Sequence, residues 1–277
     1  MNHLTRAALL LVSIAILPAC DEEETTIINQ AAGPTGPTLP PGALASGTLL
    51  ILSDRGTLLN TSSGELGTIY YDVALGGTVA AGESIVAIDY RPANGVLYGL
   101  SNQGRLYTVN PATGGCVAVN LTPIMAFTGT RFGMDFNPTV DRLRIVSDAD
   151  ENVRVNADTG ALVQVDTPLS PASDALAIAY TNNFSGATVT SLFLMDAATS
   201  SLYRLDNPNT GALTLVGAYG AGTDQAGFDI SADNVALVAR SGGGFPSVFR
   251  IDLFSGVASG LFNIDTNFAV RGLAIVP

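Results

Sequence analysis

The sequence predicts an all-β fold, a five-bladed β-propeller of four-stranded blades that is closed by the C-terminal strand joining the N-terminal blade. An Asn or Asp followed three and four residues later by Ser or Thr and by Gly recurs at intervals of 50, 46, 51 and 45 residues. Short apolar stretches alternate with Gly, Asn, Asp and Pro clusters every 8 to 12 residues from Thr48 to Pro277. The five copies of the motif begin at Asn60, Asn110, Asn156, Asn207 and Asp252.

The recurring motif has the chemistry of a tight turn. The side-chain oxygen of Asn or Asp can accept a hydrogen bond from the backbone N–H two residues later, and Gly adopts the positive φ that bulkier residues avoid. Each copy follows a short apolar stretch, as Asn110 follows Val109. We therefore expect a turn between two antiparallel strands in every unit. A sixth match, at Asn182, is out of phase and is expected in a loop.

The second unit provides the template for the strands. We expect its four strands at Ile85–Tyr90, Val96–Leu100, Arg105–Val109 and Cys116–Asn120. The next three units repeat this order, with first strands at Phe132–Phe136, Ala175–Tyr180 and Ala226–Ile230.

The fifth unit is predicted from both ends of the chain. Thr48–Leu52, Thr57–Asn60 and Leu66–Tyr71 supply three of its strands, and Val270–Val276 supplies the first. Closing a ring of blades in this way removes the free sheet edges that would otherwise pair with other chains.

The first 47 residues are expected to lie outside the propeller. Residues 1–19 place Arg6 before an apolar run, Ala7 to Leu17, that is too short to span a bilayer and is typical of a bacterial lipoprotein signal peptide. The sequence predicts Cys20 as the lipidated first residue of the mature chain and residues 20–47 as a disordered acidic and Pro/Gly-rich tether. We therefore expect residues 48–277 to form a propeller domain held at the membrane of the bacterial cell envelope, either periplasmic or at the outer surface.

Four segments resemble an uncharacterised bacterial family, domain of unknown function 4394. They are ESIVAIDYRP at residues 83–92, GMDFNPTVDR at 133–142, YTNN at 180–183 and VRGLAIVP at 270–277. The resemblance covers essentially all of Thr48 to Pro277. It implies a propeller-like secreted or envelope domain and brings no assigned activity or catalytic residues.

The composition excludes several kinds of function. After residue 19 the chain has no His or Lys, which excludes a histidine general base, an imidazole metal site and a lysine Schiff base. Eleven arginines against twenty-four acidic residues give a net charge of −13 for the mature chain, which argues against a nucleic-acid partner. Cys116 is the one other cysteine, so we expect no internal disulfide and a small buried side chain there.

Three carboxylates share one register of the first strands and are the main candidates for a binding site. Asp89, Asp135 and Asp229 would surround the central channel if these strands are innermost. Three inward carboxylates can bind Ca²⁺ or act as an acid and base pair on a glycosidic bond. The interpretation we favour is structural, with each Asp bonding the backbone of its own or the adjacent blade. Ala179 and Ala274 occupy the same register in the other two units.

Other polar residues are candidates with simpler alternatives. Arg271, in the closing strand, and Arg91, near a blade end, could contact an anionic ligand, but the interpretation we favour is a salt bridge from each to neighbouring turns. The acidic run Asp148 to Asn152 resembles a calcium loop but has Val153 and Thr159 where an EF-hand requires Gly and Glu. We therefore expect it to be a hairpin turn.

The function that the sequence favours is non-catalytic. We expect a lipid-anchored, monomeric binding or interaction module for an envelope protein or glycan, without a cofactor. The alternative is a glycosidase-like hydrolase, Ca²⁺-assisted or not, that uses the first-strand aspartates.

Overall fold

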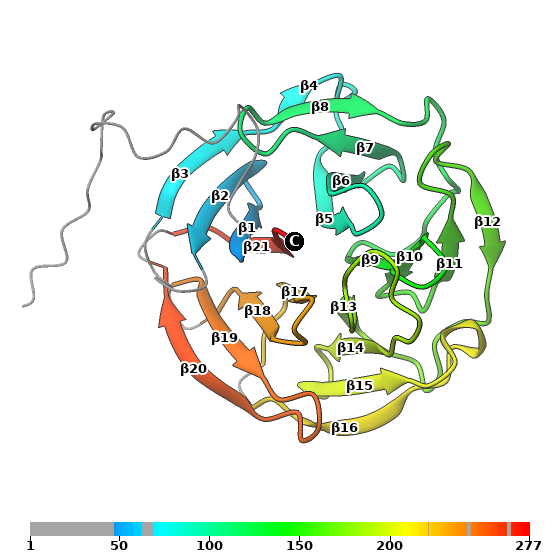
Figure 1. Cartoon of the computed structure of the whole chain (residues 1–277), viewed down its shortest axis with the longest axis vertical. Coiled ribbons are helices and arrows are strands. Elements are labelled where there is room, and N and C mark those ends of the chain that lie inside the picture. The colour runs from blue at the N-terminus through cyan, green and yellow to red at the C-terminus, as the bar shows by residue number, and fades with distance from the viewer. Residues whose placement is uncertain (1–46, 63–68, 221, 243–244, 265–266) are drawn as a thin grey trace, which may run out of the picture. The chain divides into compact units, whose positions relative to one another are not determined.

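Five β-sheets stand around a common axis in the computed structural model, and each sheet runs from the axis to the rim (Figure 1). The structure describes residues 47–62, 69–220, 222–242, 245–264 and 267–277. The architecture is therefore the predicted five-bladed propeller. In this part of the chain no helix is long and apolar enough to cross a bilayer.

The blades follow the predicted order, with the first strand of each unit innermost. Blade 1 contains β21 (Val270–Ile275), β1 (Thr48–Ser53), β2 (Thr57–Ser62) and β3 (Ile69–Ala74). Blade 2 contains β5 (Ile85–Arg91), β6 (Val96–Ser101), β7 (Leu106–Val109) and β8 (Gly115–Ala118). Blade 3 contains β9 (Phe132–Asn137), β10 (Arg142–Ser147), β11 (Asn152–Val155) and β12 (Leu162–Val165). Blade 4 contains β13 (Ala175–Tyr180), β14 (Leu192–Asp196), β15 (Ser201–Leu205) and β16 (Thr214–Ala218). Blade 5 contains β17 (Ala226–Ile230), β18 (Ala236–Arg240), β19 (Ser247–Ile251) and β20 (Ala258–Asn263).

The ring closes where β21 pairs with β1, as the sequence predicts. The two strands are antiparallel, with Leu50 opposite Ala274. Beyond this ladder, the Gly47 N–H donates to the Val276 carbonyl at 3.0 Å and the Val276 N–H donates to the Thr48 carbonyl at 2.8 Å. A short strand missed at the sequence level, β4 (Gly76–Gly77), pairs in parallel with β8 and ties the end of blade 1 to the rim of blade 2.

Four of the five motif copies form the expected turns. The Oδ1 atom of Asn110 accepts from the Ala112 amide at 3.0 Å, and that of Asp252 accepts from the Phe254 amide at 2.9 Å. The closing glycines adopt positive φ, as at Gly114 (71°) and Gly256 (75°). The prediction for Asn60 is wrong, because β2 continues to Ser62 and Asn60 pairs opposite Tyr71 inside the ladder. Gly64 of that copy lies outside the described residues.

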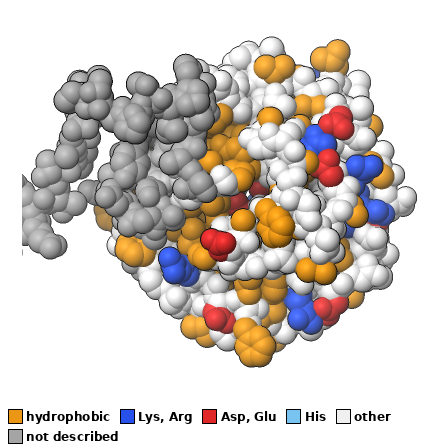
Figure 2. Space-filling model, viewed as in Figure 1, with side chains coloured by type: hydrophobic (Ala, Val, Ile, Leu, Met, Phe, Trp, Pro, Cys, Tyr) orange, Lys and Arg blue, Asp and Glu red, His pale blue; other side chains and the backbone are white. Residues whose placement is uncertain are grey.

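The apolar core is divided into five clusters, one between each pair of adjacent blades. Leu50 of blade 1 and Ile85 of blade 2, for example, share one cluster, whereas Leu49 and Ile51 contribute to the cluster on the other face of the same sheet. Both faces of an inner strand are therefore buried, which explains its continuous apolar sequence. The face shown in Figure 2 carries few charged side chains, and these are scattered among apolar and neutral ones.

The inner strands approach one another so closely that one register accepts only small side chains. Two residues before the aspartate register stand Ala87, Gly133, Ala177, Gly227 and Gly272. A Cβ at Gly227 would lie 2.1 Å from the Leu273 nitrogen, and one at Gly133 would lie 2.8 Å from the Ile178 nitrogen. Backbone contacts, and not side chains, therefore set the spacing of blades at the axis.

Gly227→Ala should destabilise the protein because the added methyl group meets the backbone of β21. Overpacking of this kind costs about 1 to 3 kcal/mol. Chemical unfolding followed by circular dichroism would measure the loss. Gly76→Ala is the control, because a Cβ there meets no heavy atom within 4 Å. Equal midpoints for the two variants would contradict the close approach of β17 and β21.

Candidate functional site at the centre of the ring

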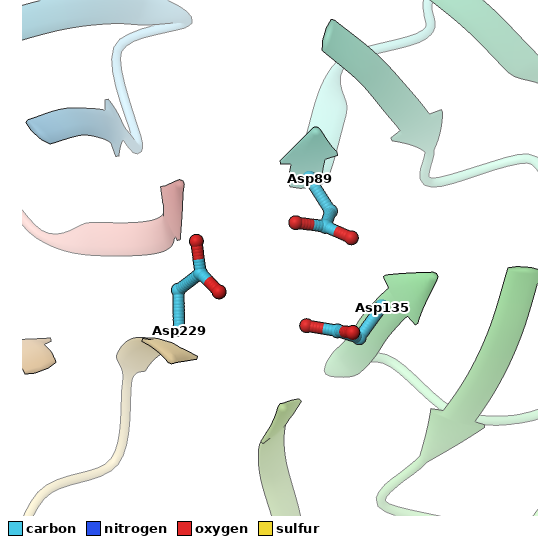
Figure 3. Close-up of side chains that lie close together, drawn as sticks. All are labelled: Asp89, Asp135 and Asp229. Atoms are coloured by element: carbon cyan, nitrogen blue, oxygen red, sulfur yellow. The ribbon is translucent and has the colours of Figure 1, made fainter. Parts of the chain in front are cut away.

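The three predicted aspartates meet on the axis of the propeller. Asp89 on β5, Asp135 on β9 and Asp229 on β17 each offer a carboxylate oxygen, and these three oxygens lie within 4.8 Å of one another. Figure 3 shows the three side chains extending from separate strands toward a common point. All three residues are at most 1% exposed.

Each carboxylate bonds the backbone across a blade boundary. The Phe136 amide of blade 3 donates to Asp89 Oδ2 at 2.8 Å, and the Ile275 amide of blade 1 donates to Asp229 Oδ2 at 2.6 Å. The Tyr180 amide of blade 4 contacts the Asp135 carboxylate in the same manner. In each case the donor is the residue directly after the aspartate-register position of the next blade. The aspartates therefore bond the backbone of the adjacent blade, as the structural interpretation of the sequence expects.

Two aspartates also accept from an amide of their own strand. Three carboxylates can therefore provide an acceptor for one inner-strand amide in each of the five blades. Asp229 Oδ1 accepts from the Ile230 amide at 2.6 Å, and the Tyr90 amide lies against Asp89. The Ile230 amide lies in blade 5 and the Tyr90 amide in blade 2. The blades before them carry Ala179 and Ala274 in the aspartate register, so neither amide receives a carboxylate from the preceding blade. The distribution of Asp and Ala around the ring therefore matches the supply of acceptors to the inner backbone.

Burial and mutual repulsion keep protons on this cluster. Burial raises the pKa of Asp229 to about 7. Burial, and then the charge of Asp229, raise the pKa of Asp89 well above its ordinary value. Burial and the charges of both neighbours do the same to Asp135. Three carboxylates at this spacing cannot all be ionised without a compensating cation.

The carboxylates are enclosed. Each is at most 1% exposed, and none of them lines the pocket at the channel mouth or the hollow beside the small residues. A hollow of about 10 Å³ lies beside the register of small residues, next to Gly133 and Gly227. This hollow is about the size that holds one water molecule. A polymeric substrate therefore has no path to these carboxylates in this conformation.

A second arrangement, at the mouth of the central channel, contains Arg271. Its side chain lines a pocket of about 30 Å³ together with Thr130, Arg131 and Gln225. Among the described residues, no acidic side chain lies within ion-pair distance of Arg271. The salt bridge considered for Arg271 at the sequence level is thus not observed. The Gln225 Oε1 atom is buried there without a hydrogen-bond partner.

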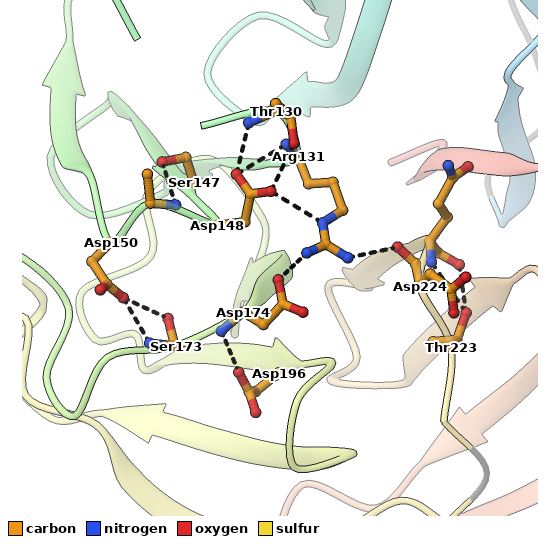
Figure 4. A network of polar contacts seen from close by, with 12 residues as sticks. Thr130, Arg131, Ser147, Asp148, Asp150, Ser173, Asp174, Asp196, Thr223 and Asp224 are labelled. Atoms are coloured by element: carbon orange, nitrogen blue, oxygen red, sulfur yellow. Dashed lines mark hydrogen bonds and ion pairs between the residues drawn. The ribbon is translucent and has the colours of Figure 1, made fainter. Parts of the chain in front are cut away.

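Arg131, in contrast, is fixed by acidic side chains. It forms ion pairs with Asp148 (3.2 Å) and Asp174, and it donates to the Asp224 carbonyl at 3.2 Å (Figure 4). Asp148 in turn accepts from the Thr130 amide at 2.7 Å. Sequence reasoning missed Arg131, although its position immediately before β9, like that of Gln225 before β17, was a usable signal.

The comparison with known families decides the assignment of the chain. A family model described as a domain of unknown function (DUF4394) matches residues 57–274. The chain belongs to this family. No curated protein matches the chain.

Solved structures resemble the DUF4394 domain in fold. A structural genomics protein of unknown function from Bacteroides thetaiotaomicron VPI-5482 has a TM-score of 0.52 and 15% identity over 83% of this chain. The chain spans 59% of the length of that protein. A chain of a nidogen/laminin complex has a TM-score of 0.46 and 13% identity, covering 83% of this chain and 98% of its own. The likeness to the Bacteroides protein concerns the fold alone.

Other sequence candidates have structural roles in the DUF4394 domain. Arg91 forms ion pairs with Asp141 and Asp158, each at 2.5 Å, as the simpler alternative held. The segment Asp148 to Glu151 is the turn between β10 and β11, not a calcium loop. Cys116 is buried, and burial raises the pKa of its thiol. The predicted signal peptide, Cys20 and residues 21–46 of the tether lie outside the described residues.

In a metal-free buffer, the free energy of unfolding should fall as pH rises from about 4 to 7. The unfolded chain loses the Asp229 proton near its ordinary pKa of 3.8, whereas the folded chain holds it to about 7, so the stabilisation is present below pH 3.8 and lost through this window. Each such group contributes about 1.4 kcal/mol per pH unit. Chemical unfolding at several pH values measures the slope.

Asp135→Asn should make that slope shallower and leave the variant more stable than the wild type at pH 8 by about 1 to 3 kcal/mol. The substitution keeps one oxygen for the Tyr180 amide and replaces Oδ1, which has no partner. The exposed Asp206→Asn is the matched control and should leave the slope unchanged. Parallel curves for wild type and Asp135→Asn would show that the cluster holds no extra proton.

Proposed function

We propose that this protein is a lipid-anchored binding module of the bacterial cell envelope, and that it holds an anionic group of an envelope protein or glycan at the mouth of its central channel. The observation that carries the proposal is Arg271, which lines the pocket at the mouth and has no ion-pair partner among the described residues. A guanidinium group presents a planar set of donors that matches a carboxylate or phosphate.

The neighbours of Arg271 suit a polar, partly anionic ligand. Gln225 offers a buried carbonyl oxygen that has no partner, and a ligand hydroxyl or amide can donate to it. Arg131 is held in place by Asp148 and Asp174, so its position is set before a ligand arrives. An acidic sugar or an acidic peptide would meet this combination of groups, which favours a glycan or protein ligand.

The hydrolase alternative receives less support from the geometry. An acid and base pair must approach the reacting bond within hydrogen-bond distance. The three aspartates are enclosed and each bonds an amide of an inner strand, so none of them is presented to a substrate outside the ring. We therefore favour binding over turnover as the role of the propeller.

Arg271→Gln should weaken binding of an acidic ligand about tenfold or more, because a hydrogen bond to a charged group contributes about 1.5 to 3 kcal/mol. A glycan array containing matched acidic and neutral oligosaccharides would find the ligand, and titration calorimetry would compare the variants. Arg204→Gln is the control, because Arg204 is exposed on blade 4 and paired with Asp206. Turnover of a glycan or ester by the wild type would instead support the hydrolase alternative.

Lipid attachment at Cys20 is tested separately. Wild-type protein expressed in a bacterial host should incorporate an alkyne-labelled fatty acid and fractionate with membranes, whereas Cys20→Ser should do neither. Cys116→Ser should behave like the wild type, since Cys116 is buried in the propeller. Label retained by Cys20→Ser would contradict the proposed anchor while leaving the binding proposal intact.

A further inference from the structure

The axial carboxylate cluster of Asp89, Asp135 and Asp229 leaves oxygen atoms that the backbone does not use. Asp89 Oδ1 and Asp135 Oδ1 are buried and have no hydrogen-bond partner among the described residues. A buried acceptor without a partner costs free energy, and the cost is larger for a charged group. The amide bonds described above therefore account for only part of this cluster.

A neutral side chain adds an independent oxygen beside the cluster. Asn183 is 7% exposed, its side chain bonds Asp229, and its Oδ1 atom is also buried without a partner. The two ends of an amide group are nearly the same in shape, so a half turn of the group would present this oxygen in place of the N–H donor. Carboxylate and amide oxygens together are the ligands that Ca²⁺ takes in proteins.

The spacing of the oxygens fits one Ca²⁺ ion. We propose that the axial carboxylate cluster is a Ca²⁺ site in which Asp89, Asp135 and Asp229 each donate an oxygen and Asn183 completes one side. Ca²⁺ binds oxygen at about 2.3 to 2.6 Å, so two ligands on opposite sides of the ion can be roughly 5 Å apart. The three carboxylate oxygens lie within 4.8 Å of one another, so one ion can reach all three. Mg²⁺ demands near-ideal octahedral geometry and gives up its water molecules reluctantly, so enclosed carboxylates favour Ca²⁺.

The surroundings provide a route and a reason for the ion. Asn183 also lines a pocket of about 210 Å³ that includes Ser231 and Asp233, so it stands between the cluster and the surface. A divalent ion would offset the repulsion among three carboxylates that come from blades 2, 3 and 5, and it would join those blades at the axis. The site is separate from Arg271 and does not depend on the proposed binding role.

Thermal unfolding of the chelator-treated protein tests the site. The midpoint of unfolding should rise by about 5 °C or more when Ca²⁺ is added at about 100 times its dissociation constant. Mg²⁺ at the same concentration should have a smaller effect. Titration calorimetry should give one Ca²⁺ per chain. Arg271→Gln should keep the full Ca²⁺-induced rise of the unfolding midpoint, so the Ca²⁺ site can be tested independently of ligand binding at Arg271.

Substitutions locate the ion. Asp89→Asn and Asp135→Asn should each lose most of the Ca²⁺ shift, whereas Asp206→Asn, with the same change of charge at the surface, should keep it. Calcium content of the wild type after dialysis provides a measurement that does not require the variants to fold. If Ca²⁺ does not raise the unfolding midpoint of the wild type, or raises that of Asp135→Asn equally, the proposed site is wrong. Shared protons would then be what relieves the repulsion among the three carboxylates.

Discussion

The rest of the structure depends on the close approach of five inner strands at one axis. A Cβ at Gly227 would collide with the backbone of β21, and the other four positions of this register carry only Gly or Ala. Such an approach leaves room for about one water molecule beside this register, so the amides that face the axis need acceptors from the protein itself. Asp89, Asp135 and Asp229 supply them across three blade boundaries.

This solution creates an electrostatic problem of its own. A carboxylate is a stronger acceptor for an amide than a neutral group, but three of them in one enclosed volume repel one another. Burial raises the pKa of Asp229 to about 7, so without a cation the cluster retains protons at neutral pH. The same side chains that satisfy the inner backbone thereby form a site whose charge must be balanced by protons or by a metal ion.

The sequence predicts the blades and the aspartate register but not how these parts meet. The apolar runs and phased turns locate the first strands, because period and turn chemistry are local properties. The exception at Asn60 arises because β2 extends further and pairs through a bulge between Asn60 and Thr61. The bonds from Asp89 to Phe136 and from Arg131 to Asp174 join separate blades. Contacts of that kind depend on the packed ring and have no local signal in the sequence.

The closing strand β21 connects every feature of the centre. It pairs with β1 to close the ring, carries Arg271 at the mouth of the channel and places Gly272 in the narrow register. Its Ile275 amide bonds Asp229. The Arg271 and Ile275 positions are separated along one extended strand, with the small residues between them, so a ligand at the mouth cannot touch the carboxylates. β9 and β17 also run from the mouth to the carboxylates, but β21 is the strand whose displacement would open the ring as well.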